Sequence, residues 1–173
     1  MMNQSNVLYI DLERKGFYVK NRTELFNEWL GGVGVALQLY KEEAVKGADP
    51  LDSGNAIVFA VGPLTALYPL ASKVVAVFKS PLTGNYGESH AGGRSATAIK
   101  SAGYEAIVIK GVSDRPIYLV ISEKGVQFRD AATLWGMRST YTVGRVLREA
   151  LPGAGLRTMM RIGRAGEKLV RYA

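Results

Sequence analysis

The stretch from His90 to Arg94 has the residue types of an anion-binding site. Gly92 and Gly93 let backbone N–H groups approach an anion closely, and the helix predicted after them adds partial positive charge. Lys73 and Lys79 flank a neighbouring predicted strand, so their ammonium groups are candidates for the same anion. A tight turn is the alternative interpretation of a glycine pair before a helix. The candidate binding residues are Lys73, His90, Ala91, Gly92, Gly93 and Arg94.

Two other glycine clusters lie at residues 31–34 and 163–166. The first lacks the G-x-G-x-x-G spacing with a downstream acid and does not directly follow a predicted strand, so it does not support a Rossmann site. The chain has no Gly-Lys-Ser/Thr of a P-loop and no G-x-S-x-G elbow. Because His90 is the only histidine that could act as a base, hydrolase chemistry is not favoured.

The composition excludes several classes of protein. The 173 residues include no cysteine and one histidine, which excludes a disulfide framework, a zinc finger, a cysteine nucleophile and an iron–sulfur cluster held by this chain. There are 22 lysines and arginines against 15 acidic residues, and this net charge of +7 favours a negatively charged partner. The basic residues are spread along the chain without a nucleic-acid-binding motif, so nucleic acid is an alternative partner that no motif supports.

Hydrophobic patterning predicts more strands than helices. A β-hairpin is expected from residues 7–12 and 17–19, and helices from 21–30, 33–44, 94–102 and 140–150, the first with the capping-box spacing of Asn21 and Glu24. Further strands are expected at residues 56–61, 74–78, 106–109, 117–121, 126–128 and 158–162.

The order of these elements predicts an α+β fold in a single domain over residues 1–173. A strand followed by Pro-Leu-Thr occurs twice, at residues 63–65 and again 18 positions later at 81–83, which suggests an internal duplication. No apolar run reaches the ~18 residues of a membrane span, and no secretory signal is present at Met1 to Asn6, so no membrane association and a cytoplasmic location are expected.

Short motifs follow one another in a specific order along nearly the whole chain. They are LYIDL at 8–12, WLGGVGVA at 29–36, DPL at 49–51, VGPLT at 61–65, KSPLTG at 79–84, GG at 92–93, KSAGYEAIVI at 100–109, IYL at 117–119, RDA at 129–131, LWG at 134–136 and IGRAGEKLV at 162–170. Taken in this order, the motifs resemble the N-terminal domain of the aldehyde ferredoxin oxidoreductases, a family of tungsten- or molybdenum-dependent enzymes that oxidise aldehydes.

The resemblance implies two mixed or antiparallel β-sheets with short helices, related by a pseudo-two-fold axis, that form a saddle under a cofactor. The family's cofactor is tungsten or molybdenum held by two pterins whose phosphates are joined through magnesium. Lys73 stands where the family usually has an arginine near the pterins, and His90 stands where an asparagine helps to hold the magnesium. Any magnesium contact of His90 would come from its backbone, so no side chain is expected to ligate a metal.

The resemblance also implies that catalysis needs a longer protein. The family's iron–sulfur cysteines and aldehyde-facing residues belong to later domains, so we expect this chain to be a fragment that holds no cofactor and is inactive by itself. Its expected partners are the remaining domains of the same polypeptide, ferredoxin as electron acceptor and, as an option, a second copy in a homodimer. The alternative function is a non-catalytic module that binds an anion, a nucleotide or nucleic acid on the same basic, glycine-rich surface.

Overall fold

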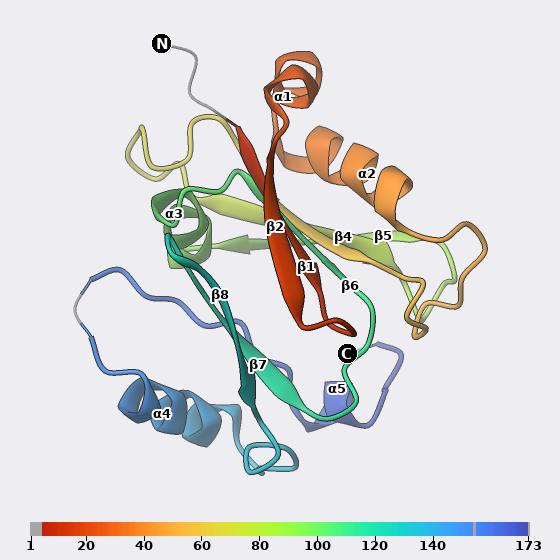
Figure 1. Cartoon of the computed structure of the whole chain (residues 1–173), viewed down its shortest axis with the longest axis vertical. Coiled ribbons are helices and arrows are strands. Elements are labelled where there is room, and N and C mark those ends of the chain that lie inside the picture. Colours follow the sequence, from red (N-terminus) through yellow and green to blue (C-terminus); the bar gives the residue numbers. More distant parts are fainter. Residues whose placement is uncertain (1–4, 154, 173) are drawn as a thin grey trace.

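The apolar run of β1 (Asn6–Asp11) lies inside a sheet that is covered on both faces. A computed structural model describes residues 5–153 and 155–172, and its larger sheet has the strand order β2-β1-β6-β3-β4-β5 (Figure 1). The other strands of this sheet are β2 (Gly16–Asn21), β3 (Ile57–Val61), β4 (Lys73–Lys79), β5 (Tyr86–Gly92) and β6 (Ala106–Lys110). A separate two-stranded sheet pairs β7 (Ile117–Ser122) with β8 (Gly125–Asp130).

The helices connect and cover these strands. They are α1 (Thr23–Trp29), α2 (Gly32–Glu43), α3 (Arg94–Ser101), α4 (Thr140–Ala150) and α5 (Arg164–Glu167). Strands β1 and β6 are parallel, whereas the remaining neighbours in both sheets are antiparallel, so the expected α+β class is confirmed. Among the residues that the structure describes, no helix is both long enough and apolar enough to cross a membrane.

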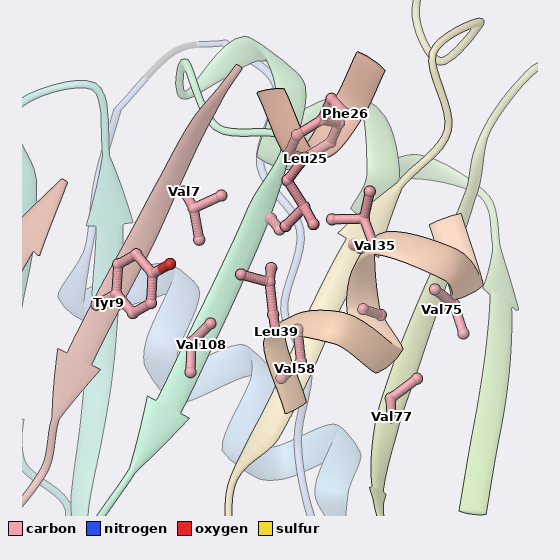
Figure 2. Close-up of a cluster of buried hydrophobic side chains, with 13 residues drawn as sticks. Val7, Tyr9, Leu25, Phe26, Val35, Leu39, Val58, Val75, Val77 and Val108 are labelled. Atoms are coloured by element: carbon pink, nitrogen blue, oxygen red, sulfur yellow. The ribbon is translucent and has the colours of Figure 1, made fainter. Parts of the chain in front are cut away.

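Two apolar clusters lie on opposite faces of the larger sheet. Under α1 and α2, side chains from four strands and both helices point toward one another, among them Tyr9, Leu39 and Val77 (Figure 2). The other face packs Leu8, Ile10 and Val74 against α3 and against apolar side chains of the β7–β8 hairpin. Since successive side chains of a strand point to opposite faces, burial on both sides explains why the strand runs are continuously apolar.

Four local expectations differ from the structure. The strand at residues 158–162 is wrong, because this segment has no regular secondary structure in a region where most side chains are exposed. The helix α1 has Arg22 as its N-cap, and Asn21 instead accepts from the Thr23 N–H at 3.1 Å, so the capping box is not formed. The strand β5 and the one-turn helix α5 were not expected.

The repeated strand-plus-turn units do not occupy equivalent places in two related sheets. Strands β3 and β4 are antiparallel neighbours in the same sheet, with Val61 opposite Val74. The two sheets also differ in size, with six strands and two strands. The structure therefore corrects the expectation that these units mark equivalent positions in two sheets, and it does not show the pseudo-two-fold duplication.

A buried arginine ties the β1–β2 hairpin to both helices of the same face. Arg22 donates from Nη1 and Nη2 to the two carboxylate oxygens of Glu42, at 2.8 and 3.0 Å, and from Nε to Glu24 at 3.0 Å. Its Nη1 also donates to the Tyr9 hydroxyl at 3.0 Å. The bond from Arg22 lowers the pKa of Glu42, whereas burial raises the pKa of Tyr9. This forked pairing fixes α2 relative to the sheet.

The Arg22–Glu42 pair makes stability depend on pH. Since the folded protein holds the pKa of Glu42 below its ordinary 4.5, the ionised carboxylate stabilises the fold above that pH, and this contribution is lost as pH falls through the lowered pKa. Glu42→Gln is expected to lower the free energy of unfolding by about 1 kcal/mol at pH 7, a value reduced because the side chain is 45% exposed. Urea unfolding of wild type, E42Q and the exposed-turn control E123Q at pH 7 and pH 3.5 measures this. An E42Q deficit that is the same at both pH values contradicts it.

Candidate functional site

The glycine pairs at 31–32 and 92–93 lie at the same end of the larger sheet. Gly31 packs against the end of β3, where a Cβ added to it would lie 2.9 Å from the Val61 carbonyl oxygen. Val61 is opposite Val74, and the preceding residue of β4, Lys73, is opposite Gly92. Two strand spacings of about 4.8 Å therefore separate the end of β3, which Gly31 contacts, from the end of β5, which Gly92 occupies.

The candidate binding residues from the sequence divide between the two faces at this end. The side chains of Val75 and Val77 in β4 pack under α2, and Lys73 projects from the same face of this strand. Gly92 is opposite Lys73 and His90 is opposite Val75, so both also lie on the α2 face. Ala91 is opposite Val74 and belongs to the α3 face. Gly93 is the N-cap of α3, and Arg94 is its first residue. All six residues are exposed, and Lys73, Gly92 and His90 form the closest group on one face.

Two helices begin at this end with open backbone donors. Neither the N-cap Gly31 of α2 nor the N-cap Gly93 of α3 makes a side-chain capping bond, and neither helix has an acidic residue in its first turn. Their first N–H groups and the positive ends of both helix dipoles thus add to the charges of Lys73 and Arg94. The arrangement suits a ligand with more than one anionic group.

A serine before β4 fixes the start of α3. The Ser72 hydroxyl hydrogen-bonds with the Gly93 carbonyl oxygen and lies 3.2 Å from the Thr97 hydroxyl. Gly93 has φ +87°, a conformation that favours glycine, and a Cβ there would meet no heavy atom within 4 Å. The turn at Gly93 is therefore set by backbone conformation and by Ser72, and its solvent side stays open.

The structure removes Lys79 from the candidate group. Lys79 is at the opposite end of β4, about 20 Å from Lys73 at ~3.3 Å per residue, and its Nζ donates to the Ala48 carbonyl oxygen at 2.5 Å. There it lines a cavity of about 520 Å³ between α2 and the β4–β5 turn, together with Tyr40, Lys41, Lys46 and Tyr86. The cluster at residues 163–166 is also separate, with Gly163 near Thr140 and Glu167 accepting from the Gly136 N–H.

A row of hydrogen-bonding side chains along β5 was missed by the sequence reasoning. Glu88 accepts from the Tyr86 hydroxyl at 2.5 Å and hydrogen-bonds with His90 Nε2 at 3.2 Å. Burial and the adjacent Glu88 raise the pKa of Tyr86 to about 12, and the bonds from Tyr86 and His90 lower the pKa of Glu88. The signal was the spacing of two residues between Tyr86, Glu88 and His90, which places them on one face of a strand.

The side chains of the described residues form no group of three His, Cys, Asp or Glu that could hold a metal ion. At the glycine end the available groups are ammonium, guanidinium and imidazole nitrogens and backbone N–H donors. This donor set favours anions, and the nearest carboxylate on the same face is Glu88, which is hydrogen-bonded to His90.

Comparison with known proteins decides the family. Residues 7–173 match the family model described as "Aldehyde ferredoxin oxidoreductase, N-terminal domain". The chain belongs to this family. Among curated proteins, the chain is similar to the tungsten-containing aldehyde ferredoxin oxidoreductase of Pyrococcus furiosus, with 36% identity over 151 residues. That alignment covers 87% of this chain and 25% of the relative.

Proteins with other names are also similar to this chain. The WOR-like subunit of an aliphatic sulfonate oxidoreductase from Pyrococcus furiosus is 33% identical over 181 residues, covering 96% of this chain and 29% of the relative. Among solved structures, the active site complex BamBC of benzoyl coenzyme A reductase, in complex with 1,5-dienoyl-CoA, has a TM-score of 0.79 and 25% identity over 84% of this chain and 22% of that chain. The aldehyde ferredoxin oxidoreductase N-terminal domain described here thus spans about a quarter of the length of its relatives.

The contact of Gly31 with β3 predicts a strong position-specific effect on stability. Gly31→Ala is expected to cost about 2–3 kcal/mol, because φ is +131° and the added Cβ would lie 2.9 Å from a backbone oxygen. Gly32→Ala, with φ +57° and open space, is expected to cost about 1 kcal/mol. Gly62→Ala, with open space and no positive φ, is the control and should change stability by less than ~0.5 kcal/mol. Thermal and urea unfolding measure the series, and equal losses for all three variants contradict the proposed contact.

Proposed function

We propose that the sheet end formed by Lys73, His90, Ala91, Gly92, Gly93 and Arg94 holds the phosphate-bearing part of a tungsten– or molybdenum–bis-pterin cofactor with its magnesium. The observation that carries this proposal is the cross-strand pairing of Lys73 with Gly92, which puts a cation beside open backbone donors. Two helix N-termini at the same end add further positive potential. Family membership supplies the identity of the anion.

The residues present fit a phosphate-bearing ligand. A Cβ added at Gly92 or Gly93 would meet no heavy atom within 4 Å, so a ligand can approach the backbone there. Lysine supplies charge at position 73 without the fork of an arginine, and Arg94 supplies a fork one residue beyond Gly93. Magnesium between phosphates would be met by a backbone oxygen such as that of His90, in keeping with a site that lacks a side-chain metal cluster in its described residues.

The proposed role of this domain is to bind and orient the cofactor within a longer oxidoreductase. When bound, such a cofactor accepts the electrons that leave the substrate. The proteins similar to this chain include an aldehyde ferredoxin oxidoreductase, an aliphatic sulfonate oxidoreductase and a benzoyl coenzyme A reductase. These names refer to different substrates, so the region that the proteins have in common is better suited to a function that does not depend on the substrate. Binding of the cofactor is such a function.

Substrate oxidation and electron transfer are assigned to other parts of that longer protein. An iron–sulfur cluster needs thiolates, and this chain has no cysteine, so the proposal places the cluster on later domains and ferredoxin as their electron acceptor. The aldehyde ferredoxin oxidoreductases among the relatives favour an aldehyde as the substrate class. The 173-residue chain is expected to bind phosphates without catalysing oxidation.

Lys73→Glu tests the anion site with inorganic pyrophosphate as the probe. In NMR titrations of the 173-residue chain, pyrophosphate is expected to shift the backbone N–H signals of Gly92 and Gly93, and K73E is expected to weaken binding on the order of tenfold at low salt. Lys124→Glu makes the same change of charge in the exposed β7–β8 turn and serves as the control. Equal weakening in both variants, or shifts confined to other residues, contradicts the site. In the longer protein, K73E but not K124E should lower the metal and pterin content.

A further inference from the structure

A cavity of about 520 Å³ lies at the end of β4 that is remote from the glycine pairs. It is bounded by the C-terminal end of α2, the loop that follows this helix and the turn between β4 and β5, which lie together at the right of Figure 1. Small-molecule sites in proteins have volumes of roughly 300–1,000 Å³, so this cavity can hold an organic ligand. Because Lys79 in this cavity and Lys73 in the candidate cofactor site are at opposite ends of β4, the two sites are separate.

The charged side chains that line this cavity are all basic. They are Lys41, Lys46 and Lys79, and no aspartate or glutamate of the described residues lines it. Within the described part of the chain, the ion pairs of lysine use other positions, so these three ammonium groups have no carboxylate partner. Lys79 Nζ donates to the Ala48 carbonyl oxygen, which leaves two of its three N–H bonds for a ligand. The cavity therefore favours an anion.

Neutral hydrogen-bond donors lie beside these ammonium groups. The backbone N–H groups of Lys46 and Gly47, which both line the cavity, have no acceptor among the described residues. Gly47 has φ +84°, and a Cβ there would meet no heavy atom within 4 Å, so a ligand can approach this part of the backbone closely. Asn85 contributes a side-chain amide from the turn between β4 and β5. An anion in the cavity would thus find N–H donors as well as positive charge.

Much of the remaining lining is aliphatic or aromatic. These residues are Leu37, Tyr40, Ala44, Val45 and Tyr86. The Tyr40 hydroxyl donates to Asn55 and the Tyr86 hydroxyl donates to Glu88, so the rings are what these tyrosines offer a ligand. Burial raises the pKa of both phenols, so both stay uncharged at neutral pH and do not repel an anion. The cavity combines apolar walls with cations, which suits a ligand that has an apolar body and an anionic group.

We propose that this cavity binds a small carboxylate with an aromatic or branched aliphatic body. The place of the cavity in the fold distinguishes a carboxylate from a phosphate. The C-terminal end of α2 carries a partial charge of about −0.5, which opposes a multiply charged phosphate more strongly than a singly charged carboxylate. The candidate cofactor site differs in this respect, because two helix N-termini lie there. The proposal rests on the cavity alone and does not depend on the proposed cofactor role.

NMR titration of the 173-residue chain with 2-naphthoate tests the site. This carboxylate is expected to shift the backbone N–H signals of Gly47, Asn85 and Tyr86, with a Kd on the order of 1 mM for a ligand of its size. The uncharged analogue 2-naphthylmethanol is expected to bind at least about fivefold more weakly, because it lacks the attraction to the ammonium groups. Equal binding of the two probes, naphthoate shifts confined to Gly92 and Gly93, or no shifts at ~5 mM naphthoate overturns the proposal.

Lys46→Gln and Tyr86→Ala test the two kinds of lining separately. Both residues are exposed, and each variant is expected to weaken naphthoate binding about threefold to tenfold at low salt, by removing a cation or a ring. Lys124→Gln makes the same change of charge in the β7–β8 turn and should leave naphthoate binding unchanged. K46Q should also leave pyrophosphate binding unchanged, so this site and the candidate cofactor site can fail independently. Equal weakening of naphthoate binding in K46Q and K124Q, or equal weakening of naphthoate and pyrophosphate binding in K46Q, indicates a general effect of net charge and overturns the proposal.

Discussion

Both faces of the central strands of the six-stranded sheet are buried, and this constraint organises the domain. The central strands β1, β3 and β6 are apolar apart from the polar ends of β1 and β6, so their side chains form a core on each face of the sheet. Helices α1 and α2 cover one face, and α3 with the β7–β8 hairpin covers the other (Figure 1). Because α2 and α3 start at the same end from opposite faces, the chain turns sharply there twice, at Gly31-Gly32 and at Gly93. The same turns leave backbone donors open beside Lys73.

The sequence predicts the apolar elements well, because burial on both faces leaves long runs of Val, Ile and Leu. The β1–β2 hairpin and strands β3, β4 and β6 were expected nearly to their observed limits. Strand β5 was missed because its glycine, serine and histidine residues have little intrinsic preference for strands, and pairing with β4 is what orders it. The expected strand at 158–162 fails for the opposite reason, since its β-branched residues have no neighbouring strand to pair with.

The sequence predicted which residue types form the candidate site better than it predicted which of them lie close together. The residue types around Gly92 indicated an anion site. The register of β4 with β5 brings Lys73 next to Gly92, and this proximity could not be predicted from a sequence motif. Lys79 has the same side chain and flanks the same strand, but seven residues of extended backbone place it at the far end. The contact between Gly31 and Val61, and the bond from Ser72 to Gly93, depend on tertiary packing and have no local signature.

The parallel pairing of β1 with β6 has a consequence for how the chain folds during synthesis. Val7 is opposite Ala106, so β1 cannot pair with its neighbour β6 until about a hundred more residues have been synthesised. Strand β3 depends on the same late strand through the pairing of Ile57 with Ile109. Until β6 is made, no strand joins the β1–β2 hairpin to the β3–β5 meander. Such nonlocal closure is slow, because the entropy of closing the long loop is lost before the strands pair.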